Sequence, residues 1–385
     1  MRHFDQIDTA LRKHLFYRHP RGFDRHDDPA VLAVALGATL YTPAVRPRLA
    51  EDVAKAAARG VRSLVVCLED SIADADVPAA ERNAVTQLTR LHAEGGPAPL
   101  LFVRVRAPHQ IGDLVDRLGA AAGLLTGFVL PKFTAETGGA FLDALAETRA
   151  RTGRRLLAMP VIESRDAVHA ETRAPLLRDV AALLGKHREH VLAVRIGATD
   201  LSAAYGLRRP PDLTIYDIGP VAGAISDVVN VLGRADGTGF VVTGPVWEYF
   251  SAGERIFKPQ LREAPFQAQR AVPLRQRLIG SDLDGLLREV HLDKANGLTG
   301  KTVIHPTHVA AVHALSVVTH EEYCDAADIL GVAGGGAMAS SYANKMNEAK
   351  PHRAWAERLM LRARVFGVAA EGVTFVELLE AAGAR

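Results

Sequence analysis

The sequence has few cysteines, little net charge and no long apolar run. Only two of its 385 residues are cysteines, Cys67 and Cys324, and they lie far apart, in no metal-binding or redox spacing. This favours a reducing compartment and a fold without structural disulfides. The formal net charge of +2 gives no reason to expect nucleic acid or a membrane surface as a partner.

Targeting and membrane-spanning segments are also missing. No apolar stretch reaches the roughly 20 residues that a transmembrane helix needs. The first 29 residues are rich in charge and histidine and have no apolar core, which is unlike a signal peptide. We therefore expect a soluble cytoplasmic protein.

What the sequence does contain is a repeated alternation of apolar and helical segments. Apolar residues make up 48% of the chain and charged residues 23%, enough for a large core. Stretches rich in Ala, Leu, Arg and Glu, such as Arg48–Arg59, Ala80–Ala93 and Gly139–Arg151, separate short apolar runs. The eight runs are Ala38–Thr42, Ser63–Leu68, Leu100–Val105, Gly127–Leu130, Leu156–Ile162, Leu192–Ile196, Gly239–Thr243 and Thr302–Ile304.

Such alternation is typical of parallel βαβ units, and eight of them favour a closed (β/α)8 TIM barrel, with an open doubly wound sheet as the alternative. We expect an N-terminal arm over residues 1–36 and the barrel over 37–320, with an insertion near 251–281. A C-terminal helical segment over 321–385 should contain a flexible stretch, Gly331–Ser341. The basic arm could hold a phosphate or CoA, but a solvated or subunit-contacting segment is favoured.

The predicted strand ends carry an unusual number of ionisable residues. In a TIM barrel the active site lies at the C-terminal ends of the strands. One charged residue there is ordinary loop solvation, whereas seven strand ends of eight favour a site. The residues concerned are Arg46, Glu69 and Asp70, Arg104 and Arg106, Lys132, Glu163, Asp200 and His305.

Glu163 and Asp200 follow successive predicted strands, so their carboxylates should be neighbours. Two hard oxygen ligands that leave room for water and substrate suit Mg²⁺, and no Cys/His cluster competes for a transition metal. The alternative is that each carboxylate only caps the following helix. The pair would let a bound metal stabilise an enolate while a C–C bond breaks or forms.

Other strand-end residues are candidates for substrate binding. Arg104 would grip a carboxylate, or pair with Glu69 or Asp70, and both can hold together. Lys132 either lines the rim or forms a Schiff base, and a carboxylate metal site makes the second role redundant. For His305 the sequence leaves two roles open, one in the barrel scaffold and one in the site. The remaining substrate-binding candidates are Arg106, Thr42, Pro43, Ala198 and Thr199.

Taken in order, these motifs resemble the HpcH/HpaI aldolase and citrate lyase family, on the side of the citrate lyase β-subunit. The resemblance spans about Leu36 to Ile329 and points to a divergent bacterial member. It is carried by Leu40-Tyr41-Thr42-Pro43-Ala44, Val65-Val66-Cys67-Leu68-Glu69-Asp70-Ser71, Phe102-Val103-Arg104-Val105-Arg106, Gly127-Phe128-Val129-Leu130-Pro131-Lys132, Val161-Ile162-Glu163-Ser164, Gly197-Ala198-Thr199-Asp200-Leu201 and Gly300-Lys301-Thr302-Val303-Ile304-His305-Pro306.

The resemblance implies a barrel of the phosphoenolpyruvate/pyruvate type, Mg²⁺ on Glu163 and Asp200, substrate contact by Arg104 and a trimeric or hexameric homo-oligomer. The aldolase branch carries a base histidine after its second strand, where this chain reads Leu68-Glu69-Asp70-Ser71. Many CoA-ester lyases of the family carry a Lys-Met-Ile-Asp-Pro-like motif whose Asp enters a neighbouring subunit's site. The nearest segment here is Lys345-Met346-Asn347-Glu348, so Glu348 is a candidate acid or base, with a helix N-terminal charge as the alternative.

The sequence therefore predicts a Mg²⁺-dependent carbon–carbon bond lyase acting on a carboxylate or acyl-CoA substrate. The catalytic candidates are Arg104, Glu69, Asp70 and Glu348. The alternatives are a CoA-independent class II type aldolase on a 2-oxo acid or sugar-like substrate, and a catalytically silent binding barrel. Nucleotide binding rests only on Ala295–Thr302, which starts with Ala where a phosphate loop needs Gly.

Overall fold

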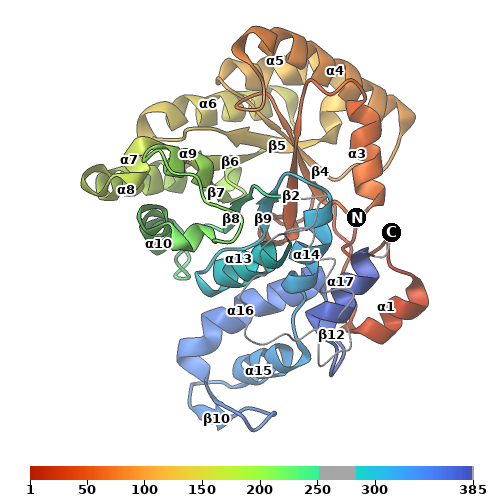
Figure 1. The fold of residues 1–385 in the computed structure, drawn as a ribbon, viewed down its shortest axis with the longest axis vertical. Coiled ribbons are helices and arrows are strands. Elements are labelled where there is room, and N and C mark those ends of the chain that lie inside the picture. The colour runs from red at the N-terminus through yellow and green to blue at the C-terminus, as the bar shows by residue number, and fades with distance from the viewer. Residues whose placement is uncertain (251–282, 384–385) are drawn as a thin grey trace.

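A closed barrel of eight parallel strands forms the centre of the molecule (Figure 1). The computed structural model describes residues 1–250 and 283–383, so the predicted insertion near 251–281 lies outside the described residues. The strands close in the order in which they occur in the chain. They are β2 (Ala38–Pro43), β3 (Ser63–Cys67), β4 (Leu100–Arg104), β5 (Leu125–Leu130), β6 (Leu157–Ile162), β7 (Val194–Ile196), β8 (Val242–Trp247) and β9 (Lys301–Val303).

Helices surround the barrel and bury the outer face of its strands, which is why β3, β5 and β6 are mostly apolar and are buried at every residue. The prediction of a (β/α)8 barrel is thereby confirmed. The surrounding helices are α3 (Leu49–Ala58), α4 (Val77–Glu94), α5 (His109–Leu118), α6 (Ala135–Thr152), α7 (Arg165–Val168), α8 (Ala170–Lys186), α9 (Ala198–Ala203), α10 (Gly219–Leu232), α13 (Leu283–Ala295) and α14 (Thr307–Ser316).

One strand lies several residues further along the chain than its sequence suggests. The predicted run Gly239–Thr243 stops before Gly244-Pro245, a pair that usually interrupts a strand. In the structure β8 continues through this pair to Trp247, and its register with β9 shifts between Gly244 and Val246. Because β8 ends at Trp247, the residue that follows the strand is the charged Glu248 and not the neutral Gly244.

The N-terminal residues pack across the end of the barrel where the strands begin. They contain α1 (Thr9–Leu15), β1 (Phe16–Arg18) and α2 (Pro29–Ala35). Arg62, just before β3, donates to the carbonyl of Arg2 at 2.7 Å, and Arg155, just before β6, donates to the carbonyl of His26 at 2.7 Å. Basic residues of this segment therefore lie one strand length from the carboxyl ends, too far to reach a ligand bound there in the same chain.

The C-terminal residues form a helical layer that joins the N-terminal ones. α15 (His320–Gly331) packs on α16 (Ala349–Phe366), and α17 (Phe375–Gly383) packs on α14. Strand β12 (Val368–Ala369) pairs with β1, so that the two ends of the described chain lie side by side (Figure 1). The division of the chain into arm, barrel and C-terminal segment stays a prediction.

The stretch predicted to be flexible contains a strand. β10 (Ala337–Ala339) pairs with β11 (Met346–Glu348) in an antiparallel hairpin, which Figure 1 shows at the end of the molecule farthest from α5. In residues 1–250 and 283–383 we find no helix with the length and apolar character needed to cross a membrane.

Candidate active site

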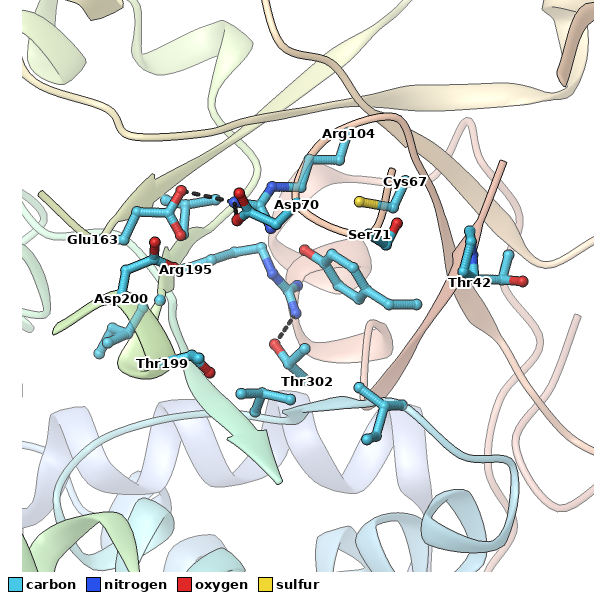
Figure 2. A pocket seen from close by; sticks show the side chains of 17 residues that line it. Thr42, Cys67, Asp70, Ser71, Arg104, Glu163, Arg195, Thr199, Asp200 and Thr302 are labelled. Atoms are coloured by element: carbon cyan, nitrogen blue, oxygen red, sulfur yellow. Dashed lines mark hydrogen bonds and ion pairs between the residues drawn. The ribbon is translucent and has the colours of Figure 1, made fainter. Parts of the chain in front are cut away.

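A cavity of about 420 Å³ opens at the carboxyl ends of the barrel strands. Side chains from β2, β3, β4, β6, β7, β8 and β9, or from the loops that follow them, line it (Figure 2). The strand-end candidates that line it are Thr42, Pro43, Asp70, Arg104, Glu163, Thr199 and Asp200. The pocket therefore forms where the sequence predicts a site.

Glu163 and Asp200 lie side by side on one wall of this pocket (Figure 2). Glu163 directly follows β6 and is buried, and Asp200 lies in the first turn of α9 after β7. Burial raises the pKa of Glu163 to about 7, and the charge of Asp200 adds to the rise while Arg104 opposes it. Burial and the charge of Asp70 likewise raise the pKa of Asp200. In both carboxyl groups the largest cause of the raised pKa is burial, which disfavours the charged form, and neighbouring carboxylates add to it.

The backbone beside Glu163 is shaped to hold its carboxylate. Gly197 precedes α9, and a Cβ atom on this residue would come within 2.2 Å of Glu163 Oε2. On the other side, the N–H of Lys132 donates to Glu163 Oε1 at 2.8 Å. Lys132 adopts φ 47°, a left-handed conformation that costs free energy in a non-glycine residue and is typical of functional sites.

Arg104, the last residue of β4, connects three carboxylates. Its Nη2 lies 2.7 Å from Glu69, 2.8 Å from Glu163 and 3.3 Å from Asp70. Although burial lowers the pKa of Arg104, the Glu163 carboxylate raises it above its usual range. No described residue accepts a hydrogen bond from Nη1, so this group remains available to a ligand in the pocket.

Lys132 does not line the pocket and pairs with two of the same carboxylates. Its Nζ is 2.8 Å from Glu69 and 3.3 Å from Asp70. The hydrogen bond to Glu69 raises the pKa of Lys132 above its usual range. An amine held protonated in this way is a poor nucleophile, so the Schiff-base alternative loses support.

These groups suit a divalent cation. With every group ionised, the rim has a surplus of two negative charges: Glu69, Asp70, Glu163 and Asp200 against Arg104 and Lys132. Carboxylate oxygens are the ligands that Mg²⁺ prefers. Within the described residues, no group of three or more His, Cys, Asp or Glu could hold a metal ion. A metal here would therefore rest on the Glu163–Asp200 pair and complete its shell with water or substrate.

Six other predicted residues, Arg46 and Glu69 among them, do not line the pocket. Ala198 is buried behind it. Arg106 points to the loop after β3, where it donates to the carbonyls of Leu68 at 2.7 Å and Glu69 at 3.0 Å. His305 stacks on Phe250 at 4.7 Å between ring centroids, and Glu348 is exposed on the β10–β11 hairpin. Arg106 therefore fixes the loop that carries Asp70.

Two charged residues at the site do not follow any of the predicted strands. Arg195 lies within β7 and lines the pocket, and a charged residue inside an apolar run was the signal that could have revealed it. Glu248 accepts a hydrogen bond from Thr199 Oγ1 at 3.1 Å. The predicted seventh strand ends at Thr243, so the sequence pattern does not place Glu248 at a strand end.

Comparison with protein families identifies the relatives of this barrel. The family described as C–C bond lyases of the TIM-barrel fold matches residues 30–368, which is most of the chain. The chain belongs to this family. No curated protein matches the sequence.

The chain is also similar to solved structures. CitE from Mycobacterium tuberculosis, in complex with magnesium, acetoacetate and coenzyme A, is 20% identical with a TM-score of 0.52, over 86% of this chain and 99% of that one. The citrate lyase β-subunit of M. tuberculosis with oxaloacetate and magnesium is 22% identical with a TM-score of 0.43, over 72% and 96%. RipC from Yersinia pestis is 18% identical with a TM-score of 0.44, over 73% and 95%. At these identities the likeness concerns the fold alone.

Proposed function

We propose that this member of the C–C bond lyase family is a Mg²⁺-dependent lyase that cleaves or forms a C–C bond in a carboxylate or acyl-CoA substrate. The observation that carries the proposal is the Glu163–Asp200 pair in a pocket whose carboxylates outnumber its cations. Magnesium and coenzyme A, named for the M. tuberculosis CitE structure, are extended to this chain only as part of the proposal.

Glu163 and Asp200 would hold the metal. When bound, Mg²⁺ supplies Lewis-acid stabilisation of the negative charge that develops on a substrate oxygen. Arg104 would bind the substrate carboxylate through Nη1 while its Nη2 stays on Glu69, Asp70 and Glu163. Because three carboxylates fix this guanidinium, it is oriented before the substrate arrives.

Glu69 and Lys132 would keep that arrangement rigid. The carboxylate of Glu69 is buried and receives Arg104 on one oxygen and Lys132 on the other, at 2.7 and 2.8 Å. Lys132 is thereby held on Glu69 and Asp70, and Arg104 is held between Glu69 and Glu163. Lys132 remains protonated and adds positive charge near the mouth of the pocket.

The acid or base of the reaction would come from a neighbouring copy of the chain. Glu348 lies on an exposed hairpin outside the pocket of its own chain, so it could act only across a subunit interface. This part of the proposal requires a homo-oligomer. Mass measurement in solution tests it, because a strictly monomeric protein would leave Glu348 without a role in catalysis.

Calorimetric titration of Mg²⁺, with pyruvate present, tests the metal site. Glu163→Gln/Asp200→Asn should abolish Mg²⁺ binding, since both charged ligands are replaced by neutral ones of the same shape. The matched control Glu189→Gln/Asp227→Asn removes two exposed carboxylates outside the pocket and should bind Mg²⁺ like the wild type. Equal binding by both double variants, or by neither the wild type nor the variants, would refute the metal assignment.

A further inference from the structure

Among the residues that the structure describes, the buried cation Arg195 has no carboxylate partner. It lies in β7 with 1% of its surface exposed and contributes to the pocket lining. Nη1 lies 3.5 Å from Thr39 Oγ1 and 3.8 Å from Met159 Sδ, and Nη2 donates to Thr302 Oγ1. Among residues 1–250 and 283–383 no carboxylate lies within ion-pair distance. The other buried arginines of the pocket region differ, because Arg104 pairs with three carboxylates and Arg209 with Glu289.

This arrangement has a physical cost that a ligand would remove. Burial removes the water that would otherwise solvate the guanidinium of Arg195. A buried charge is usually paired, and hydroxyl and thioether partners do not neutralise it. The ring of Tyr41, 5.4 Å from the guanidinium carbon, offers only a weaker cation–π contact. Within residues 1–250 and 283–383 the positive charge of Arg195 thus lacks a carboxylate partner, and an anion that enters the pocket would supply one.

The position of Arg195 separates it from the rim cluster. Figure 2 shows its guanidinium pointing to Thr302, whereas Arg104 points to Glu163. Arg104 and Arg195 come from β4 and β7, nearly opposite each other around the barrel. Thr302 and Thr39 fix the guanidinium from β9 and β2, so its donors are oriented in advance.

We propose that Arg195 binds a second anionic group of the substrate, which makes the preferred substrate a dicarboxylic acid rather than a monocarboxylic one. The inference rests on the proposed function for the first carboxylate, which Arg104 and the metal would hold. The second carboxylate would lie on Arg195, near Thr302. A charge-assisted hydrogen bond to a preorganised guanidinium contributes enough to favour the dicarboxylate by about tenfold or more.

Calorimetric titration of malate and lactate in the presence of Mg²⁺ tests this, because both are 2-hydroxy acids and they differ by one carboxylate. The wild type should bind malate at least about tenfold more tightly than lactate. Arg195→Met should weaken malate binding by about that factor and leave lactate binding within about twofold. Arg195→Lys, which retains the charge, should keep part of the preference. The control Arg62→Met removes a buried arginine at the opposite end of the barrel and should leave the preference intact.

Two further measurements separate failure of this proposal from failure of the proposed function. Suppose that lactate binding needs Mg²⁺ and persists in Arg195→Met, and that this variant still prefers malate as strongly as the wild type does. That result would overturn the role of Arg195 and leave the proposed function standing. Succinate titrated in EDTA tests Arg195 without the metal, and its loss in Arg195→Met would support the subsite even if the Glu163/Asp200 test failed. A wild type that binds none of the three acids would overturn both proposals. If Arg195→Met does not fold, Thr302→Val, which removes the hydroxyl that holds the guanidinium, should reduce the malate preference in the same direction.

Discussion

At the scale of single residues, the site depends on how closely the backbone approaches each carboxylate. Glu163 fits between the N–H of Lys132 and the bare backbone of Gly197. The residue types at these positions follow from space and hydrogen bonding rather than from charge alone. A change that adds one carbon atom beside Glu163 should therefore disturb the site without disturbing the barrel.

Gly197→Ala provides that change. The new Cβ would overlap Glu163 Oε2, so the carboxylate has to move, and we expect metal-dependent turnover to fall by about a hundredfold, a typical effect of a displacement of about 1 Å. The measurements are Mg²⁺ affinity and kcat. The control is Gly185→Ala in α8, where nothing lies within 4 Å of the new carbon and activity should stay at the wild-type level. Wild-type Mg²⁺ affinity in Gly197→Ala would contradict this account of Glu163.

At the scale of elements, one buried carboxylate ties the β10–β11 hairpin to helix α15. Asp325 is fully buried and accepts hydrogen bonds from Ser340 at 2.6 Å and Asn347 at 2.8 Å, and its other oxygen lies 2.8 Å from Lys345. The short, exposed strands of this hairpin bury little apolar surface of their own. Its order therefore depends on this polar anchor, and with it the position of Glu348.

Asp325→Ala should loosen the hairpin while the barrel stays folded. Loss of the carboxylate leaves Ser340 and Asn347 without their partner, which costs about 1–3 kcal/mol of local stability. Amide hydrogen exchange over Ala337–Ala339 should accelerate accordingly, and exchange in the barrel strands should not change. Asp328→Ala is the control from the same helix, because this half-buried carboxylate accepts a solvent-exposed hydrogen bond from Ser341, whose loss should cost less than the loss of the buried Asp325. Unchanged exchange in Asp325→Ala would show that the anchor lies elsewhere.

At the scale of the whole molecule, the first and last segments of the chain close the end of the barrel opposite the site. His3 from the N-terminal residues stacks on Phe366 of α16 at 4.2 Å and contacts His313 of α14 at 4.5 Å. His313 Nε2 accepts the N–H of Ala38 at the start of β2, at 3.2 Å. Segments more than 300 residues apart in the sequence thus meet around two buried imidazoles.

These imidazoles should make stability fall in mild acid. Burial, helped by the charge of Arg62, lowers the pKa of His313 to about 3, and burial and His313 also lower the pKa of His3. The unfolded chain takes up a proton below about pH 6.5 and the folded chain does not, so the stabilisation is complete above that pH and is lost as the pH falls toward 3. For His313 alone we expect a loss of about 1 kcal/mol between pH 7.5 and 5.5.

Denaturant unfolding at the two pH values measures this difference. His313→Gln should be less stable at pH 7.5 but should lose less stability on acidification than the wild type. His14→Gln, which changes an exposed histidine of the same N-terminal segment, should keep the wild-type pH dependence. A His313→Gln variant with the full wild-type loss would show that other groups govern the acid response.

The sequence by itself determined the barrel and the place of the site. Apolar runs at regular intervals can bury both faces only in a covered parallel sheet, and residues that follow parallel strands must gather at one edge. Thus Glu163, Asp200 and Arg104 could be assigned to one rim from local pattern alone. The family resemblance agreed, and the match over residues 30–368 confirmed it.

Only the tertiary structure decided which groups on that rim pair and which remain unpaired. Barrel closure brings Arg195 between Thr39 and Thr302, residues from β2 and β9, and no local pattern encodes that neighbourhood. It also carries β8 past Pro245, which puts Glu248 beside Thr199, and it sends the basic N-terminal residues to the opposite end of the barrel. The physical reason is that hydrophobic periodicity is set by each segment alone, whereas the partner of a buried charge is set by segments far apart in the chain.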